Sequence, residues 1–207
     1  MSARGEDSPA GGPRLVTEER GPFAVIRLVR PAERNPLSTA TLDELDSAFI
    51  TLSARTDLRA VIFTGSGDAF ASGADIRELE ALSAEAARGF SERGQRLFGR
   101  VAGSRLLTVA AVNGFCMGGG LDLALSCDLR VASASAVFGH PGARLGVITG
   151  WGGTQRLPAV VGATRALEMF LTARRVSATE ALGMGLVSRV CDPVVECALG
   201  MALNATE

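Results

Sequence analysis

The stretch Thr108–Asp128 holds the residues whose types and spacing point most directly to chemistry. It begins with a short apolar run that is typical of a buried strand, continues through an Asn-Gly turn, and regains apolar residues at helical spacing after three consecutive glycines, 118–120. We therefore expect a helix to begin at these glycines. The first N–H groups of a helix lack intrahelical acceptors and lie at the positive end of its dipole, so a negatively charged oxygen can bind there when no Cβ blocks it.

A second loop of small residues, Ala69–Ile76, follows the strand-like segment 60–64. Its Ser-Gly-Ala-Asp sequence could present the N–H of Ala74 to the same oxygen. A glycine-rich turn that only lets a strand and a helix pack closely is the alternative, and for three glycines alone it is the more common one. Two such loops in one chain favour an oxyanion site, in which paired N–H groups stabilise a carbonyl oxygen that gains negative charge.

Four further motifs accompany these loops, namely Arg34–Leu37, Ala136–Gly139, Gly152–Pro158 and Glu180–Val187. Together the motifs resemble the crotonase superfamily, which includes enoyl-CoA hydratases and isomerases, and the resemblance runs from about residue 15 to residue 190. It implies an α/β fold built as a spiral of repeated ββα turns. It also implies an acyl-CoA thioester as the substrate, with coenzyme A as part of that substrate and no separate cofactor.

The resemblance assigns the two oxyanion N–H groups to Ala74 and Gly119. Hydratases of this superfamily also use two glutamates, because the addition of water to a double bond needs both a base and an acid. The first glutamate position falls on Asp122, which is a shorter carboxylate in the first turn of the expected helix. The second falls on Gly142, where no carboxylate is possible.

Asp122 has two interpretations that the sequence leaves open. It can be a catalytic base, or it can be an acid that the helix dipole favours in any first helical turn. His140 is the single histidine and lies two residues before Gly142. Its ordinary pKa of ~6.5 suits proton transfer at neutral pH. A structural role is nevertheless the interpretation that we favour for His140.

The loop of Arg34, Asn35 and Leu37 resembles the part of the superfamily that meets the adenine of coenzyme A through backbone groups. Arg34 or Arg77 could also contact the phosphates. Asp75 is expected to cap or brace its own loop rather than to react. The full set of candidate substrate contacts is Arg34, Asn35, Leu37, Ala74, Asp75, Ile76, Gly118, Gly119 and Gly142.

Alternating short apolar segments and helical segments must position these residues, and this order indicates α/β layers. Strands are expected at 14–19, 23–29, 59–64, 106–112, 129–132, 137–139 and 186–190, and helices at 38–55, 84–101, 152–161, 165–172 and 194–203. Ser177 and Glu180 form a capping-box signature for one more helix. Gly89, Gly94 and Gly99 weaken the helix at 84–101 by up to ~1 kcal/mol each relative to Ala, which suggests a flexible lid over the pocket.

Composition narrows the possible functions. The chain has 207 residues, 47% of them hydrophobic, which suffices for one core, so we expect one domain over 14–207 after a disordered tail over 1–13. A net charge of −1 offers no field that would attract nucleic acid or a membrane surface. The chain has no Lys and no Tyr, which excludes Schiff-base lysines and tyrosine bases.

The four cysteines, 116, 127, 191 and 197, include no C-x-x-C pair, so we expect reduced thiols and no metal site. The amino terminus lacks an apolar signal segment, and no stretch has the apolar length to cross a bilayer, so a cytoplasmic protein is expected. Superfamily members continue past residue 207 with helices that support trimers. The C-terminal helical part is therefore expected to be largely missing, which puts the homo-trimer or hexamer implied by the resemblance in doubt.

The function implied by the resemblance is that of an enzyme of the enoyl-CoA hydratase/isomerase type, which stabilises a thioester enolate. Two alternatives stay open. The absence of an acid at Gly142 is compatible with a catalytically impaired protein that only binds acyl-CoA. Another reaction of the superfamily, such as thioester hydrolysis or decarboxylation, would use the same oxyanion site.

Overall fold

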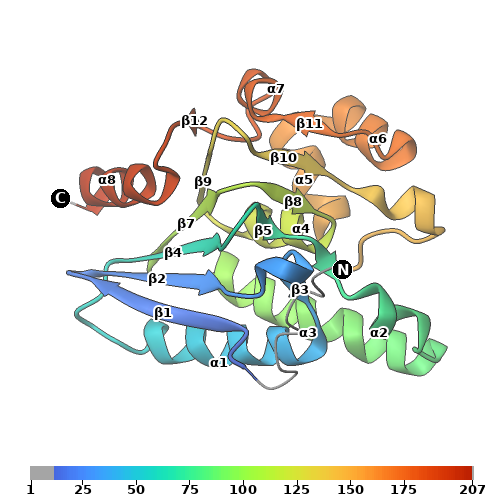
Figure 1. Cartoon of the computed structure of the whole chain (residues 1–207), viewed down its shortest axis with the longest axis horizontal. Coiled ribbons are helices and arrows are strands. Elements are labelled where there is room, and N and C mark those ends of the chain that lie inside the picture. The colour runs from blue at the N-terminus through green and yellow to red at the C-terminus, as the bar shows by residue number, and fades with distance from the viewer. Residues whose placement is uncertain (1–11, 207) are drawn as a thin grey trace, which may run out of the picture.

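Six strands form the larger sheet of the computed structural model, which describes residues 12–206 (Figure 1). Their order is β1-β2-β4-β7-β9-β12; β1 is antiparallel to β2, and all other neighbours are parallel. The strands are β1 (Leu15–Arg20), β2 (Phe23–Leu28), β4 (Ala60–Gly65), β7 (Leu107–Val112), β9 (Leu129–Ala132) and β12 (Arg189–Val190). The tail expected over 1–13 lies outside the described residues except for Gly12 and Pro13.

Both faces of the central strands are buried, which explains why these strands are apolar throughout. Successive side chains of a strand face opposite sides. In β4, Ala60 and Ile62 belong to the core shared with α8 (Val194–Thr206), whereas Phe63 packs on the other face with its ring 5.7 Å from Phe49 of α1 (Thr39–Ser53). Figure 1 shows α8 beside the sheet and α1 below it.

A second sheet of four short strands has the order β11-β10-β8-β5, and a third pairs β3 with β6. These strands are β3 (Pro36–Leu37), β5 (Ala69–Ala71), β6 (Gly73–Ala74), β8 (Phe115–Met117), β10 (Val137–Gly139) and β11 (Val176–Ser177). The chain repeatedly adds one strand to the large sheet, one to the second sheet, and then a helix. The successions β4-β5, β7-β8 and β9-β10 are three such turns, so the expected ββα spiral is confirmed.

Eight α-helices and two short 3-10 segments complete the described residues. Besides α1 and α8 they are α2 (Ile76–Glu80), α3 (Ala84–Ala102), α4 (Gly119–Ser126), α5 (Gly153–Val161), α6 (Ala163–Thr172), α7 (Ala178–Gly183), η1 (Pro31–Glu33) and η2 (Pro141–Leu145). The helix expected at the three glycines is α4. Ser177 accepts a hydrogen bond from the N–H of Glu180 at the start of α7, as its capping signature predicts.

Several expectations about strands differ from the structure. The short strands β3, β5, β6 and β11 lie in segments for which no strand was expected. Residues 115–117, placed between a turn and a helix by sequence alone, form β8, which pairs in parallel with β5 and β10. A strand of three residues has too little pattern to be recognised before its distant partners are known. The last strand is shorter than expected, because Leu186 and Val187 are buried in the turn before β12 rather than paired in a sheet.

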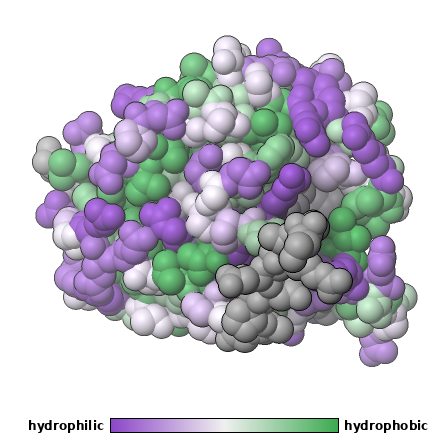
Figure 2. Space-filling view, viewed as in Figure 1, coloured by the Kyte–Doolittle hydropathy of each residue, from purple (hydrophilic) through white to green (hydrophobic). Residues whose placement is uncertain are grey.

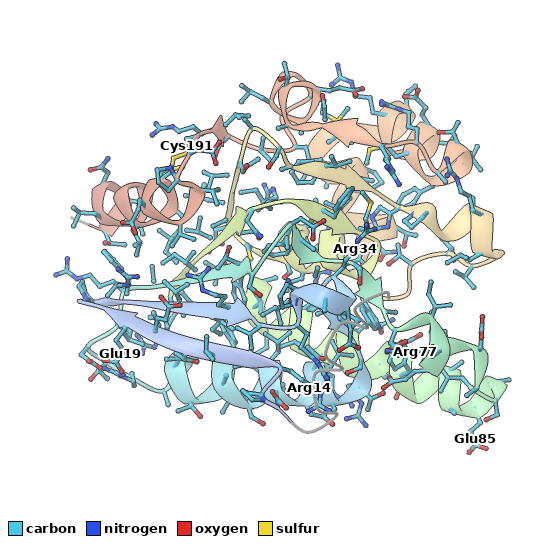
Figure 3. The ribbon with its side chains drawn as sticks, viewed as in Figure 1. Arg14, Glu19, Arg34, Arg77, Glu85 and Cys191 are labelled. Carbon is cyan, nitrogen blue, oxygen red and sulfur yellow. A yellow bond between two sulfur atoms is a disulfide. The ribbon has the colours of Figure 1, made fainter. Side chains whose placement is uncertain are left out.

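The expectation of four reduced cysteines is wrong for two of them. Cys191 and Cys197 form a disulfide, with their Cα atoms 6.4 Å apart, beside the start of α8 (Figure 3). The turn after β12 folds back into α8, and this brings together two thiols that are six positions apart in the chain. Cys116 and Cys127 are free and buried, as expected. No helix among residues 12–206 has the length and apolar character needed to cross a membrane.

Candidate active site

The two small-residue loops meet where β6 passes the start of α4. A Cβ on Gly73 would lie 2.8 Å from the carbonyl oxygen of Met117 and 3.0 Å from the N atom of Gly119. Gly73 also has a φ of +97°, a backbone conformation that favours glycine. This close approach places Ala74 and Gly119, which are distant in the chain, on the wall of one cavity.

Each of the three glycines at the start of α4 is required for a different structural reason. Gly118 has a φ of +51° and turns the chain from β8 into the helix. A Cβ on Gly119 would lie 2.2 Å from the indole of Trp151, and one on Gly120 would lie 2.3 Å from the carbonyl oxygen of Ala71. Gly119 and Gly120 therefore make room for neighbouring protein atoms. Gly118 and Gly119 line the cavity.

The cavity has a volume of about 440 Å³, within the usual range for a small-molecule site. Its walls are mostly apolar, with Leu79 and Phe90 on the side of α2 and α3 and Ile148 on the opposite side. Leu145, Val147 and Ile148 are exposed at its rim. Figure 2 shows hydrophobic surface at the right-hand edge, where Figure 1 places this segment after β10.

Asp122 lies behind the cavity wall rather than on it. It is fully buried, and the Thr149 hydroxyl donates a hydrogen bond to its Oδ2. Its Oδ1 is 3.5 Å from Nε2 of His140, which is longer than an ordinary hydrogen bond. Neither of these two atoms has a hydrogen-bond partner within residues 12–206. Thr149 and His140 line the cavity, so both separate Asp122 from it.

Burial has opposite effects on these two titratable groups because it disfavours the charged form of each. It raises the pKa of Asp122 to about 7, against the lowering effects of the Thr149 hydroxyl and of the positive charge of Arg156. It lowers the pKa of His140 to about 4. Between these two values, Asp122 carries a proton and the imidazole is neutral. The carboxyl group can therefore give up or take up a proton near neutral pH.

Gly142 lines the cavity. A Cβ at this position would lie 2.5 Å from the carbonyl oxygen of Val147, so the loop leaves no room for a side chain. The segments of residues 12–206 that line the cavity contribute no carboxylate. Asp122 contacts two of the lining residues, Thr149 and His140.

The loop before α1 supports the strand that carries Ala74. Asn35 is buried, and its side chain accepts a hydrogen bond from the N–H of Arg30 and donates to the carbonyl oxygen of Ala69 at 2.7 Å. Leu37 lies in the core and pairs with Ala74 between β3 and β6. The structure therefore places Asn35 and Leu37 as supports for β6 rather than on the cavity wall.

The charged candidates near this loop lie at the surface (Figure 3). The guanidinium of Arg34 is exposed and lies over the ring of Phe115, with its central carbon 5.0 Å from the ring centroid. Asp75 caps α2 by accepting a hydrogen bond from the N–H of Arg77, and it also forms an ion pair with the Arg77 side chain at 2.7 Å. Ile76 follows Asp75 and lines the cavity.

Sequence reasoning missed Thr149, whose contact with Asp122 joins two segments distant in the chain. Gly94 was interpreted only as a weak point of a helix, but a Cβ there would lie 2.4 Å from the indole of Trp151, so this glycine makes room for that ring. Among residues 12–206, no group of three or more His, Cys, Asp or Glu side chains could hold a metal ion.

Comparison with known proteins places the chain in one family of relatives. The family model for enoyl-CoA hydratase/isomerase matches residues 18–202. The short-chain-enoyl-CoA hydratase of Clostridium acetobutylicum is 40% identical over 86% of this chain and 69% of its own length. The crotonyl-CoA hydratase of Syntrophomonas wolfei is 41% identical over the same shares of the two chains.

Solved structures agree with the sequence relatives. The enoyl-CoA hydratase of Bacillus anthracis superposes with a TM-score of 0.89 and 35% identity, covering 93% of this chain and 76% of that one. The fold, the two glycine loops and the family model thus point to one group of proteins. The chain belongs to the enoyl-CoA hydratase/isomerase family, and so to the crotonase superfamily that its motifs resemble.

Proposed function

We propose that this protein acts on an enoyl-CoA thioester as an enzyme of the hydratase/isomerase type, with the thioester oxygen at the N–H groups of Ala74 and Gly119. The observation that carries the proposal is the contact between β6 and the start of α4, which puts both residues on the wall of an apolar cavity. The family of the chain supports the same class of substrate.

The two N–H groups would lower the energy of an enolate. When a proton leaves the carbon chain of the thioester, the carbonyl oxygen gains negative charge, and it loses this charge again when a proton joins the chain. Fixed N–H donors stabilise that charge without reorganising, and the loss of one such donor typically costs ~2.7–4 kcal/mol of transition-state stabilisation. The backbone amide of Gly119 also belongs to the first turn of α4, whose dipole adds to the effect.

The proton route would pass through Thr149. Thr149 lines the cavity, and its hydroxyl donates a hydrogen bond to Oδ2 of Asp122. The hydroxyl oxygen would accept a proton from the substrate while its own proton moves to the carboxylate, and the reverse transfer would return a proton to a different carbon. A carboxyl group with a pKa of about 7 suits both directions at neutral pH.

A site with a single carboxyl group meets the needs of isomerisation more simply than those of hydration. Isomerisation removes a proton at one carbon and returns it at another, so one group can do both. Hydration needs a base for water and an acid for carbon, and Gly142 supplies neither. His140 lines the cavity and would have to be the second group for hydration.

The test is turnover of a short 2-enoyl-CoA, which reports hydration, and of the matching 3-enoyl-CoA, which reports isomerisation. Products are separated by chromatography and identified by mass. We expect turnover of at least one substrate, and His140→Gln is expected to lose hydration while it keeps isomerisation. Tight binding of both thioesters without turnover would contradict the proposal and favour a protein that only binds acyl-CoA.

Coenzyme A itself would extend from the thioester toward the surface loop that carries Arg34. Arg34 and Arg175 lie over the same Phe115 ring, at 5.0 and 5.7 Å from its centroid, so two guanidinium groups gather there. Arginine suits phosphate groups because its planar fork can donate two hydrogen bonds. Arg34→Ala is expected to weaken acyl-CoA binding at low salt more than at high salt, as measured by calorimetry.

A further inference from the structure

Trp151 is held in place from several sides. Its indole N–H donates to the carbonyl oxygen of Phe90 at 3.3 Å, and its ring lies 5.1 Å from the ring of Phe90 and 5.6 Å from that of Phe98. The backbone is held as well, because Arg156 donates a hydrogen bond to the carbonyl oxygen of Trp151 at 3.0 Å. The residue is 4% exposed. The indole is therefore a fixed part of the site.

Two glycines from different helices make room for this one ring. A Cβ on Gly94 of α3 would lie 2.4 Å from the indole, and a Cβ on Gly119 of α4 would lie 2.2 Å from it. Phe90, Gly94 and Phe98 are four residues apart in turn, so they share one face of α3 and form a notch between two aromatic rings. A glycine inside a helix is less stabilising than an alanine, so the chain accommodates this ring at a cost in helix stability.

Trp151 lies between two cavities. One is the apolar cavity of about 440 Å³ with Ala74 and Gly119 on its wall. The other has a volume of about 380 Å³ and is lined by Gln95, Trp151, Gly152, Gln155 and Arg156. Trp151 is the one residue of 12–206 that lines both.

We propose that Trp151 is the wall that ends the acyl-binding cavity beside the oxyanion residues, and that it limits the length of acyl chain that this site accepts. This inference rests on the proposed function, because it takes the apolar cavity to hold the acyl chain. The indole touches Gly119, so it stands next to the thioester carbonyl. An acyl chain has to turn toward α2, α3 and the loop after β10, and cannot extend straight into the second cavity.

Removal of the indole would join the two cavities. A long acyl chain would then continue past Gly119 toward Gln95 and Gln155, whereas a short chain would gain nothing from the added space. Loss of the indole is therefore expected to change the ratio of the affinities for long and short acyl chains, rather than to change both affinities equally. That ratio does not depend on whether the protein turns the substrate over.

The experiment uses saturated thioesters, namely butanoyl-, octanoyl- and dodecanoyl-CoA, whose binding to the full chain is measured by calorimetry. We expect Trp151→Ala to raise the affinity for dodecanoyl-CoA relative to butanoyl-CoA at least tenfold over the wild type. Trp151→Phe keeps an aromatic wall and is expected to keep the wild-type ratio. If Trp151→Ala does not fold, Trp151→Leu opens the wall in part while it keeps apolar contacts with the notch, and a smaller change in the same direction is expected.

The matched control is Phe98→Leu, which removes a ring on the other side of the indole at a position that lines neither cavity. It is expected to lower stability without changing the ratio. An unchanged ratio in a folded Trp151→Ala or Trp151→Leu protein would overturn the inference, and so would an equal change in Phe98→Leu. If the wild type binds none of the three thioesters, the proposed function fails instead, which separates the two outcomes.

Discussion

The two sides of the cavity are built from different parts of the chain. The proposed oxyanion side consists of backbone N–H groups, and glycines at close approaches fix their places. The proton side consists of the side chains of Asp122, Thr149 and His140, which come from three separate segments. The first depends on backbone packing and the second on single polar atoms. Substitutions on the oxyanion side should therefore lower activity by disturbing the fold. Substitutions on the proton side should lower activity by removing a group that transfers protons.

The largest expected effect comes from Gly119→Val. The new side chain would meet the Trp151 indole at the closely packed start of α4, and overpacking of this kind costs ~1–3 kcal/mol or more. We expect a lower thermal midpoint and loss of turnover together. Gly89→Ala in α3 is the matched control, because nothing lies within 4 Å of its Cβ, and it is expected to be neutral or stabilising. A stable, active Gly119→Val protein would refute this packing argument.

Asn35→Ala tests the support of the oxyanion side without touching the cavity wall. Its side chain bonds to the N–H of Arg30 and to the carbonyl oxygens of Ser66 and Ala69. A buried polar group left without a partner costs ~1–3 kcal/mol, so urea unfolding should show a loss of at least that size. Asn204→Ala on the exposed face of α8 should leave stability unchanged. Equal stability of the two variants would contradict the supporting role.

The proton side predicts a smaller effect that depends on pH. Folded Asp122, with a pKa of about 7, keeps a proton that the unfolded chain loses above pH 3.8, so its contribution to stability falls as pH rises through this window. His140, with a pKa of about 4, stays neutral where the unfolded chain takes up a proton below pH 6.5, so its contribution rises with pH. In the wild type the two contributions offset each other between about pH 4 and 6.5.

Substitution of either Asp122 or His140 should leave the other group as the source of the pH dependence of stability. The His140→Gln variant keeps only the Asp122 contribution, so its stability is expected to fall as pH rises from about 4 to 7. Asp122→Asn is expected to gain stability as pH rises from about 4 to 6.5. Thermal midpoints across this range for the three proteins measure both slopes, and parallel curves would show that the pair does not titrate as described.

The difference between local sequence patterns and contacts of distant residues explains which features the sequence could predict. The apolar strands, the capping serines and the helix at the three glycines are local patterns, and so are the motifs that resemble the superfamily. Thr149 carries no such pattern, because its role comes from a contact with a side chain in another segment. Gly94 appeared as a weak point of α3 because its neighbour, Trp151, is distant in the chain. The Cys191–Cys197 disulfide was missed because only the chain fold brings these thiols together.

The most direct test of the account is proton exchange in D2O. It asks whether a substrate proton reaches Asp122 through the Thr149 hydroxyl. The rate of deuterium uptake by a 3-enoyl-CoA is measured by mass spectrometry for the wild type, Thr149→Ser and Thr149→Val. We predict that Thr149→Ser exchanges like the wild type and that Thr149→Val, at unchanged thioester affinity, exchanges ~10²–10⁴-fold more slowly. A Thr149→Val protein that exchanges at the wild-type rate would contradict the account.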